Sequence, residues 1–359
     1  MHNKKINIID VTDLYHPYQD IGDNIDLITP FSLPEVNLLA VVLDTTERFR
    51  HEKTFDADGH CLDGQGPREP GIIPVNQLNM IFNKNVPYAV SPFNPMKSAD
   101  DTLCDAPDYQ QQGINLIIDT LRKADDMVDI LVFSSLRAVA AAFNREPQLF
   151  HDKVRRIHIS AGSTSSRFIE WNIALDPLAA VCVLNSGLPI NLYPCANDRS
   201  PFELCEYNSF WLLDNMRFVK NMRPRLKSYL QYVFTRSGRI DFLRAMEEPA
   251  DETVMENFYS FSHKVWETAA WLELTDRCVV KNAAGEYRIV RRQEIAPGDT
   301  PVKTEMRNCR LSVNNDGGFD FEIVSDESNI KIFYREKPIE YQHALNMAFG
   351  DWFADFDVF

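Results

Sequence analysis

The chain has 359 residues, is 45% hydrophobic and carries a formal net charge of -15. It therefore lacks the basic footprint that binding to nucleic acid or to an anionic membrane surface requires. No segment reaches the roughly 18 apolar residues of a membrane span, and the first residues lack the apolar stretch of a signal peptide. We predict a cytoplasmic protein that binds a small molecule or a cation, although a chain whose signal had been removed would look the same.

Apolar runs of strand length alternate with helix-like segments up to about residue 194. Residues 111–124 place apolar side chains on one face at helical spacing. Residues 176–187 open on Asp176 and Pro177, which are preferred at a helix N-cap and first turn. Strands are predicted at 6–10, at the end of 33–44, and at 86–90, 128–133, 154–162 and 188–194; helices are predicted at 74–84, 111–124, 136–150 and 176–187.

The remaining segments differ in character. Residues 46–76 and 91–112 are polar and rich in Gly, Pro and Asp, which predicts long loops over a site. Residues 199–275 are predicted to be mostly helical. Residues 279–335 are predicted as strands and turns, followed by a last helix at 339–356.

This alternation predicts an α/β fold with a doubly wound, mostly parallel sheet flanked by helices. In such sheets ligands bind beyond the carboxyl ends of the strands. We see no convincing linker, so we predict a single domain over residues 1–359, with a helical and β-rich C-terminal part from about residue 199.

An acidic stretch follows the first predicted strand directly and contains Asp10, Asp13, Asp20, Asp23 and Asp26. Such carboxylates bind a hard cation, perform acid–base work or form a solvated acidic loop. Crowded aspartates repel one another without a counter-ion, which favours the metal interpretation. A metal-dependent phosphatase would need a two-residue Asp spacing and a glycine-rich phosphate cradle, and neither is present here.

A second segment, residues 168–194, begins with Glu170, Trp171 and Asn172 and continues into the helix capped by Asp176. A carboxylate that accepts from adjacent hydroxyls, an amide and a ring that stacks together suit a polyol. The plainer interpretation is a loop whose only fixed feature is the capped helix.

At these residues the chain resembles the nucleoside hydrolase family, the inosine–uridine-preferring type. That family carries EFNxxxDPEAA followed by sGxP, and the same order occurs here with Trp171 for the usual Phe. The residues in register are Glu170, Asn172, Asp176, Pro177, Ala179 and Ala180. The family's Asp-rich DxDPGxDDAxAL loop corresponds to the acidic stretch, its GPLTN turn to VFSSLRAVAAAF, and its last HDPLA helix to VWETAAWLEL. The resemblance extends over roughly residues 5–350.

The resemblance implies a Ca²⁺ held by carboxylates, a water on it activated for attack on the anomeric carbon of a ribosyl group, and an aspartate as general base. It implies metal ligands at Asp13, Asp23 and Glu267, with the backbone carbonyl of Phe133 as a further ligand. Asp13 would also be the base, and Asp10 is the alternative if an insertion follows it.

The resemblance also assigns the substrate, a nucleoside or related ribosyl compound. Glu170 and Asn172 would bind ribose hydroxyls or the 5′ end, and Trp171 would line that pocket. Trp266, beside the distal metal ligand, would stack on a base or close the pocket. Asp20 belongs to an insertion and would join the metal shell or only cap the loop. Members of the family usually form dimers or tetramers, so a homo-oligomer is expected.

Three positions depart from the family pattern. Gly22 replaces an aspartate that contacts ligand hydroxyls, Trp266 replaces a histidine that assists the leaving base in some members, and Ala138 replaces an asparagine. His16 and His263 lie near these motifs and either could replace a lost acid, although a lone histidine is more often structural. Two hypotheses follow: a Ca²⁺-dependent hydrolase of N-ribosyl bonds, or a relative that binds the sugar or nucleoside without turnover.

Overall fold

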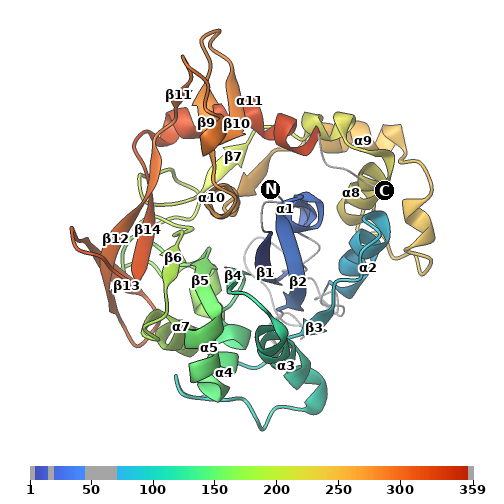
Figure 1. Cartoon of the computed structure of the whole chain (residues 1–359). Coiled ribbons are helices and arrows are strands. Elements are labelled where there is room, and N and C mark those ends of the chain that lie inside the picture. Colours follow the sequence, from blue (N-terminus) through green and yellow to red (C-terminus); the bar gives the residue numbers. More distant parts are fainter. Residues whose placement is uncertain (1–4, 15–19, 45–70, 355–359) are drawn as a thin grey trace.

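In the computed structural model, which describes residues 5–14, 20–44 and 71–354, helices surround a nine-stranded sheet (Figure 1). The strand order is β13-β12-β14-β6-β5-β4-β1-β2-β3. All neighbours from β14 to β3 are parallel, and only β12 runs antiparallel to the two strands beside it. The strands are β1 (Ile6–Thr12), β2 (Val36–Leu43), β3 (Tyr88–Val90), β4 (Val128–Phe133), β5 (Val154–Ile159), β6 (Ile190–Leu192), β12 (Thr304–Val313), β13 (Phe319–Ile323) and β14 (Ile330–Arg335).

Helices cover both faces of this sheet, which confirms the predicted fold class (Figure 1). In β1, Ile8 packs into one core while Ile9 and Val11 pack into the other, so both faces of the strand are buried. One core is covered by α1 (Ile21–Ser32), α2 (Ile72–Ile81), α8 (Pro224–Phe234), α9 (Glu252–Tyr259), α10 (Thr268–Leu274) and α11 (Pro338–Ala354); the other is covered by α3 (Asp108–Lys123), α4 (Arg137–Arg145), α5 (Pro147–Lys153) and α7 (Pro177–Leu184).

The predicted helix at 176–187 is confirmed as α7, with Asp176 as its N-cap and Pro177 in its first turn. The single helix predicted at 136–150 is wrong. It is divided into α4 and α5 at Glu146, because the residue before a proline is disfavoured in helical conformation and Pro147 starts a new helix.

Both predicted loops end earlier in the chain than the sequence suggested. Helix α2 already begins at Ile72 and α3 at Asp108, while residues 45–70 lie outside the described part of the chain. Helix α2 is stabilised because Val75, Leu78 and Ile81 are buried in the core. The polar composition of the residues before it did not reveal where the helix begins.

The C-terminal part of the chain extends the sheet formed by the N-terminal part. Strand β14 pairs with β6, and β12 and β13 add the antiparallel edge. A separate small sheet, β10 (Tyr287–Arg291), β9 (Arg277–Lys281) and β11 (Thr300–Pro301), projects beside α11 (Figure 1). The remaining short elements are β7 (Trp211–Leu213), β8 (His263–Val265), η2 (Arg217–Asn221), η3 (Arg244–Met246), η4 (Arg292–Glu294) and α6 (Trp171–Leu175).

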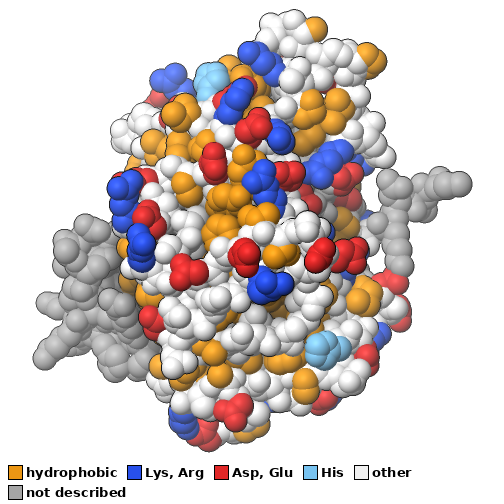
Figure 2. All heavy atoms as spheres, turned by 90° about the vertical axis from the view of Figure 1, so that its left-hand side faces the viewer, with side chains coloured by type: hydrophobic (Ala, Val, Ile, Leu, Met, Phe, Trp, Pro, Cys, Tyr) orange, Lys and Arg blue, Asp and Glu red, His pale blue; other side chains and the backbone are white. Residues whose placement is uncertain are grey.

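Figure 2 shows the face of the molecule that carries β12 and β13, where acidic, basic and apolar side chains are interspersed. Arg310 and Glu322, for example, pair across these two strands while both stay largely exposed. None of the helices within the described residues has the length and apolarity that crossing a membrane requires.

The parallel strands contain a topological switch point between β1 and β4. Within the order β3-β2-β1-β4-β5-β6, the chain moves outward in one direction from β1 and in the other from β4. Thr12 at the end of β1 is the register partner of Phe133 at the end of β4. The crevice beyond such paired strand ends is the usual ligand position in these folds.

Candidate metal centre and sugar site

The N-terminus of α1 lies beyond the end of β1. Asp20 is its N-cap, and its Oδ1 accepts hydrogen bonds from the backbone N–H groups of Gly22 at 2.6 Å and Asp23 at 3.3 Å. The acidic stretch is therefore not a loop as far as Asp26, because the helix has begun by Ile21. Of the two roles considered for Asp20, capping is the one its contacts support. Residues 15–19, including His16, lie outside the described residues.

Helix α1 and the start of α10 bring three carboxylates together. Asp23 and Asp26 are three positions apart and share one face of α1. Glu267 is the residue before α10, and its Oε2 accepts from the Trp266 backbone N–H at 2.9 Å. One ligand oxygen from each of Asp23, Asp26 and Glu267 lies within 4.8 Å of the other two.

Burial raises the pKa of the three clustered acids and of two further acids, Asp10 and Asp13. For Asp10 it raises the pKa to about 7. The pKa values of Asp13, Asp23 and Asp26 are raised well above the ordinary range, first by burial and then by neighbouring carboxylates. Burial also raises the pKa of Glu267. These acids crowd one another and lose their water, so a positive charge among them would relieve a large electrostatic cost.

The donor set fits a hard cation. Oδ1 of Asp10 and Oδ2 of Asp26 are buried and have no hydrogen-bond partner among the described residues. Asp10 also contributes to the raised pKa of Asp26, so its carboxylate lies beside the group. Carboxylate oxygens, without sulfur or imidazole, are the ligands that Ca²⁺ and Mg²⁺ prefer.

These pKa shifts predict how pH affects the stabilisation by a metal. The folded protein keeps protons that the unfolded chain has lost, so without a cation stability falls as pH rises from about 4 to about 7. A divalent cation bound by these carboxylates would compete with these protons, and it would add about 2.7 kcal/mol at 100 times its Kd. We expect Ca²⁺ to raise Tm more at about pH 7.5 than at about pH 5. Differential scanning calorimetry at both pH values checks this, and an equal or smaller rise at the higher pH would contradict it.

Other site residues were predicted at the strand ends. Phe133 ends β4, is buried, and lies opposite Thr12, so its main chain borders the same crevice as Asp13. Burial raises the pKa of Asp13 most, and Asp44, Asp20 and Glu267 then raise it further, so Asp13 lies near both Asp44 and the carboxylate group. Asp13 is not part of the three-carboxylate group, whereas the unpredicted Asp26 is.

Sequence reasoning also missed Asp44, which follows β2. Its carboxylate accepts from Ser91 Oγ at 2.5 Å and from the Ser135 backbone N–H at 3.2 Å, and lies 3.7 Å from Arg137. A signal was available, because Asp44 ends the apolar run of a predicted strand, where ligands bind in this class of sheet. For Asp26 the i, i+3 spacing from Asp23 becomes informative only once the helix is known to begin at Ile21, because other aspartates of the stretch have the same spacing.

Glu170 and Asn172 stand at the end of β5, but both side chains bind backbone groups. Glu170 is the N-cap of α6; its Oε2 accepts from the Gly162 N–H at 2.7 Å and its Oε1 from the Asn172 N–H at 3.0 Å. Burial raises the pKa of Glu170 to about 7. The Asn172 amide donates to the Ser160 carbonyl at 3.0 Å. Trp171 packs against Leu175, so these contacts fix the segment of Glu170, Trp171 and Asn172, which we call the wall.

Cys195 lies near both this wall and the carboxylate cluster. Burial raises the pKa of its thiol, and Glu170 and then Glu267 raise it further, so both glutamates lie near it. Its carbonyl accepts from the indole N–H of Trp266 at 3.0 Å. The Trp266 ring also lies 5.6 Å from Phe210, so an aromatic surface stands next to Glu267.

Comparison with known proteins places the chain in a family. The profile described as "Inosine-uridine preferring nucleoside hydrolase" matches residues 45–320. The chain belongs to this nucleoside hydrolase family. The match begins after the acidic stretch, so the assignments at residues 10–26 rest on the resemblance in sequence and on the geometry described above.

Individual relatives of this nucleoside hydrolase-family chain are distant. It is 37% identical over 82 residues to a pyrimidine-specific ribonucleoside hydrolase, RihA, of Enterobacter sp., and 34% identical over 82 residues to RihA of Escherichia coli O1:K1. Each alignment covers 22% of this chain and 26% of the relative. A solved plant nucleoside hydrolase has a TM-score of 0.51 at 13% identity and covers 96% of this chain and 98% of its own, which supports the shared fold.

The departures from the nucleoside hydrolase pattern have clear positions. Ala138 lies buried in α4, in the core on the face of the sheet opposite to α1 and α10. Gly22 lies in the first turn of α1 beside Asp23, and the imidazole of His263 packs against it. Trp266 occupies the position before Glu267 with its indole N–H already bonded to a carbonyl.

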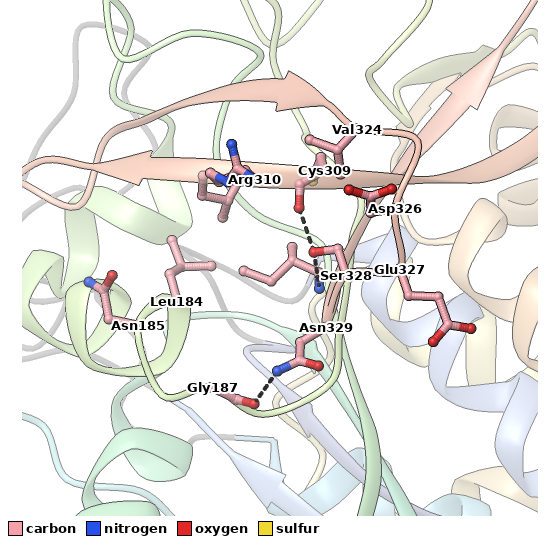
Figure 3. Close-up of a pocket in the computed structure, with 12 residues that line it drawn as sticks. Leu184, Asn185, Gly187, Cys309, Arg310, Val324, Asp326, Glu327, Ser328 and Asn329 are labelled. Carbon is pink, nitrogen blue, oxygen red and sulfur yellow. Dashed lines mark hydrogen bonds between the residues drawn. The ribbon is translucent and has the colours of Figure 1, made fainter.

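A separate hollow of about 500 Å³ lies where the end of α7 meets β12 and the β13–β14 connection (Figure 3). Two of its polar side chains bond to backbone groups of the hollow itself: Ser328 Oγ donates to the Cys309 carbonyl and the Asn329 amide to the Gly187 carbonyl. Strands β6, β5 and β4 separate β14 from β1 in the sheet. The carboxylate cluster, and not this hollow, is therefore the candidate active site.

Proposed function

We propose that the protein hydrolyses the N-glycosidic bond of a nucleoside or related ribosyl compound with Ca²⁺ as its cofactor. The observation that carries the proposal is the cluster of buried, crowded carboxylates at the switch point of a nucleoside hydrolase-family sheet. Oxygen-only ligands and raised pKa values suit a divalent hard cation.

Asp23, Asp26 and Glu267 would hold the cation, with Asp13 and the Phe133 carbonyl completing its shell. A bound divalent cation lowers the pKa of a coordinated water and so supplies a nucleophile at neutral pH. Asp13 is the proposed general base.

Asp10 remains the alternative base, since its pKa of about 7 is close to what a base needs at neutrality. Comparing Asp10→Asn with Asp13→Asn separates the two. If Asp13 is the base, Asp13→Asn should lose both kcat and Ca²⁺ affinity, because Asp13 is also a proposed ligand, and Asp10→Asn should keep most of its kcat. If Asp10 is the base, Asp10→Asn should lose kcat while it keeps Ca²⁺ binding, and Asp13→Asn should mainly lose Ca²⁺ affinity.

The proposed sugar site lies between the cluster and the wall formed by Glu170, Trp171 and Asn172. Glu170 and Asn172 would bind ribose hydroxyls or the 5′ end, and Trp171 would line the pocket. Carboxylates around the sugar would stabilise the positive charge that develops on an oxocarbenium-like transition state.

Trp266 is proposed to stack on the leaving base. We expect Trp266→Ala to raise KM for nucleosides about tenfold, because stacking of a base on an aromatic side chain is worth about 1–3 kcal/mol. Trp266→Phe should retain most of the affinity, since the ring is kept while the bond to the Cys195 carbonyl is lost. Steady-state kinetics of the two variants checks this, and equal KM values for alanine variant and unmodified protein would contradict it.

A non-hydrolytic binding protein is the second candidate, and two observations favour it. Gly22 supplies no carboxylate, and the indole N–H of Trp266 is too weak an acid to give up its proton and already donates to the Cys195 carbonyl, so neither residue can protonate a departing base. Such a protein would keep the metal and sugar sites without turnover.

One experiment separates the two candidates. The protein is incubated with Ca²⁺ and a panel of purine and pyrimidine nucleosides and p-nitrophenyl riboside, and reducing-sugar release is followed. We expect release from at least one nucleoside. Ribose binding without release from any substrate would support the binding protein and overturn the hydrolase proposal.

A further inference from the structure

Gly22 and His263 fit together at the edge of the carboxylate cluster. A Cβ on residue 22 would overlap with Nε2 of His263 and would lie 3.0 Å from its Cδ2 and 3.1 Å from Asp20 Oδ1. The imidazole therefore occupies the space in which a side chain at position 22 would start. On its other side the ring stacks on Phe261, with centroids 6.1 Å apart and planes at 29°. A larger residue at position 22 would force the imidazole of His263 out of this place.

The imidazole also contacts the cap of α1. Its Nε2 lies 3.4 Å from Asp20 Oδ1, the oxygen that accepts from the Gly22 and Asp23 N–H groups. His263 lowers the pKa of Asp20 against the opposing effect of burial. The Asp20 carboxylate thus contacts both the N-terminus of α1 and His263 of β8.

This contact joins the two segments that carry the metal-ligand candidates. Asp23 and Asp26 lie in the first turns of α1, whereas Glu267 follows β8, which begins at His263. The two segments are far apart in the chain, so a contact between them fixes the spacing of the carboxylates before any cation arrives. Groups that orient metal ligands in this way affect affinity although they never touch the metal.

We propose that His263 is a positioning residue for the metal centre, and that Gly22 is the residue that makes room for it. The inference rests on the proposed function only in that the cluster binds a cation. It also explains why position 22 has no side chain although it is adjacent to Asp23: the space is taken by an imidazole from the other segment.

The proposal is tested by a double-mutant cycle on Gly22→Ala and His263→Ala. Calorimetric titration of the metal-free full chain with CaCl₂ gives the Kd, and thermal unfolding without metal gives Tm. We expect His263→Ala to weaken Ca²⁺ binding about tenfold. Gly22→Ala should have a similar effect while His263 is present and should add almost nothing in the His263→Ala background. His263→Gln, which can still donate to Asp20, should stay within about threefold of the unmodified protein.

Two controls match these changes. His343→Ala removes an exposed histidine on α11, and Gly238→Ala adds a methyl group where no atom lies within 4 Å. Neither should alter the Kd.

The outcomes separate this inference from the metal proposal. If Gly22→Ala lowers Tm only when His263 is present, the packing part of the inference holds even if no Ca²⁺ binding is detected, in which case the metal proposal alone fails. Equal effects of Gly22→Ala in both backgrounds would overturn the inference. So would unchanged or tighter Ca²⁺ binding in His263→Ala, because a purely electrostatic role would tighten binding in both the alanine and the glutamine variants.

Discussion

Asp23→Asn and Glu267→Gln are each expected to lower the affinity for Ca²⁺ by about 100-fold or more, since loss of a direct ligand exceeds the 10–100-fold typical of an outer-shell partner. The two side chains belong to the group whose oxygens lie within 4.8 Å of one another, and each amide variant keeps the size but removes the charge. Ribose release should fall in parallel at a fixed Ca²⁺ concentration. Calorimetric titration and a kinetic assay across Ca²⁺ concentrations measure the two effects.

The same substitutions should stabilise the metal-free fold, because each removes a carboxylate whose pKa burial and its neighbours have raised. A variant that binds Ca²⁺ poorly yet melts at a higher temperature in chelator cannot be explained by misfolding. Asp119→Asn, on the exposed face of α3, is the matched control and should change neither quantity. Unchanged Ca²⁺ affinity in both Asp23→Asn and Glu267→Gln would show that the assigned ligand set is wrong.

Arg137→Ala should lower the free energy of unfolding by about 3–5 kcal/mol, the cost of leaving buried charges without their partner. The guanidinium is fully buried in the core beneath the site. Its Nε donates to Asp176 Oδ2 at 2.8 Å, and its other nitrogens donate to the Pro92 and Leu175 carbonyls. The substitution would leave Asp176 and its neighbour Asp44 without this positive charge.

Denaturant unfolding of the purified variant measures this loss. Arg122→Ala serves as the control, because Arg122 is half exposed and its ion pairs lie at the surface, where they contribute little. A loss for Arg137→Ala as small as that for Arg122→Ala would mean that the network is not a stabilising part of the fold. The backbone N–H of Met96 donates to the same Asp176 oxygen as Arg137 does. Loss of Arg137 should therefore also weaken the packing of α7 against the segment that contains Met96.

The fold could be predicted well from the sequence where one physical rule was sufficient. Apolar runs such as β4 are buried on both faces and therefore read as continuous strands, and the Asp176–Pro177 start of α7 follows from N-terminal capping. The break between α4 and α5 at Glu146 was missed because the apolar pattern continues across it, although Pro147 marked the position.

The candidate site was less predictable, since its contacts join distant parts of the chain. Asp23 and Glu267 were paired only through the family resemblance, and the structure brings their carboxylates together. Asp26 could not be separated from the other aspartates of the acidic stretch until the start of α1 fixed which side chains share its face. The packing of His263 against Gly22 is a contact between segments that no local pattern contains.

The Glu170 segment shows that a specific sequence motif does not by itself predict what its side chains contact. Its motif was the most specific signal in the sequence, but two of its side chains are engaged by backbone groups: Glu170 accepts from Gly162 and Asn172, and Asn172 donates to Ser160. Sequence identity at such positions reflects the shape of the turn as much as contact with a sugar. The wall still lies near Cys195, which is also near the metal-ligand candidate Glu267.

The central claim is that the carboxylate cluster uses Ca²⁺ to cleave an N-ribosyl bond. The most direct test measures ribose and free base released from a nucleoside by one sample of the unmodified protein, first as purified with Ca²⁺, then after chelation, and then after Ca²⁺ is returned. We predict that release is present, lost and restored in that order. Release that continues unchanged through chelation would contradict the account.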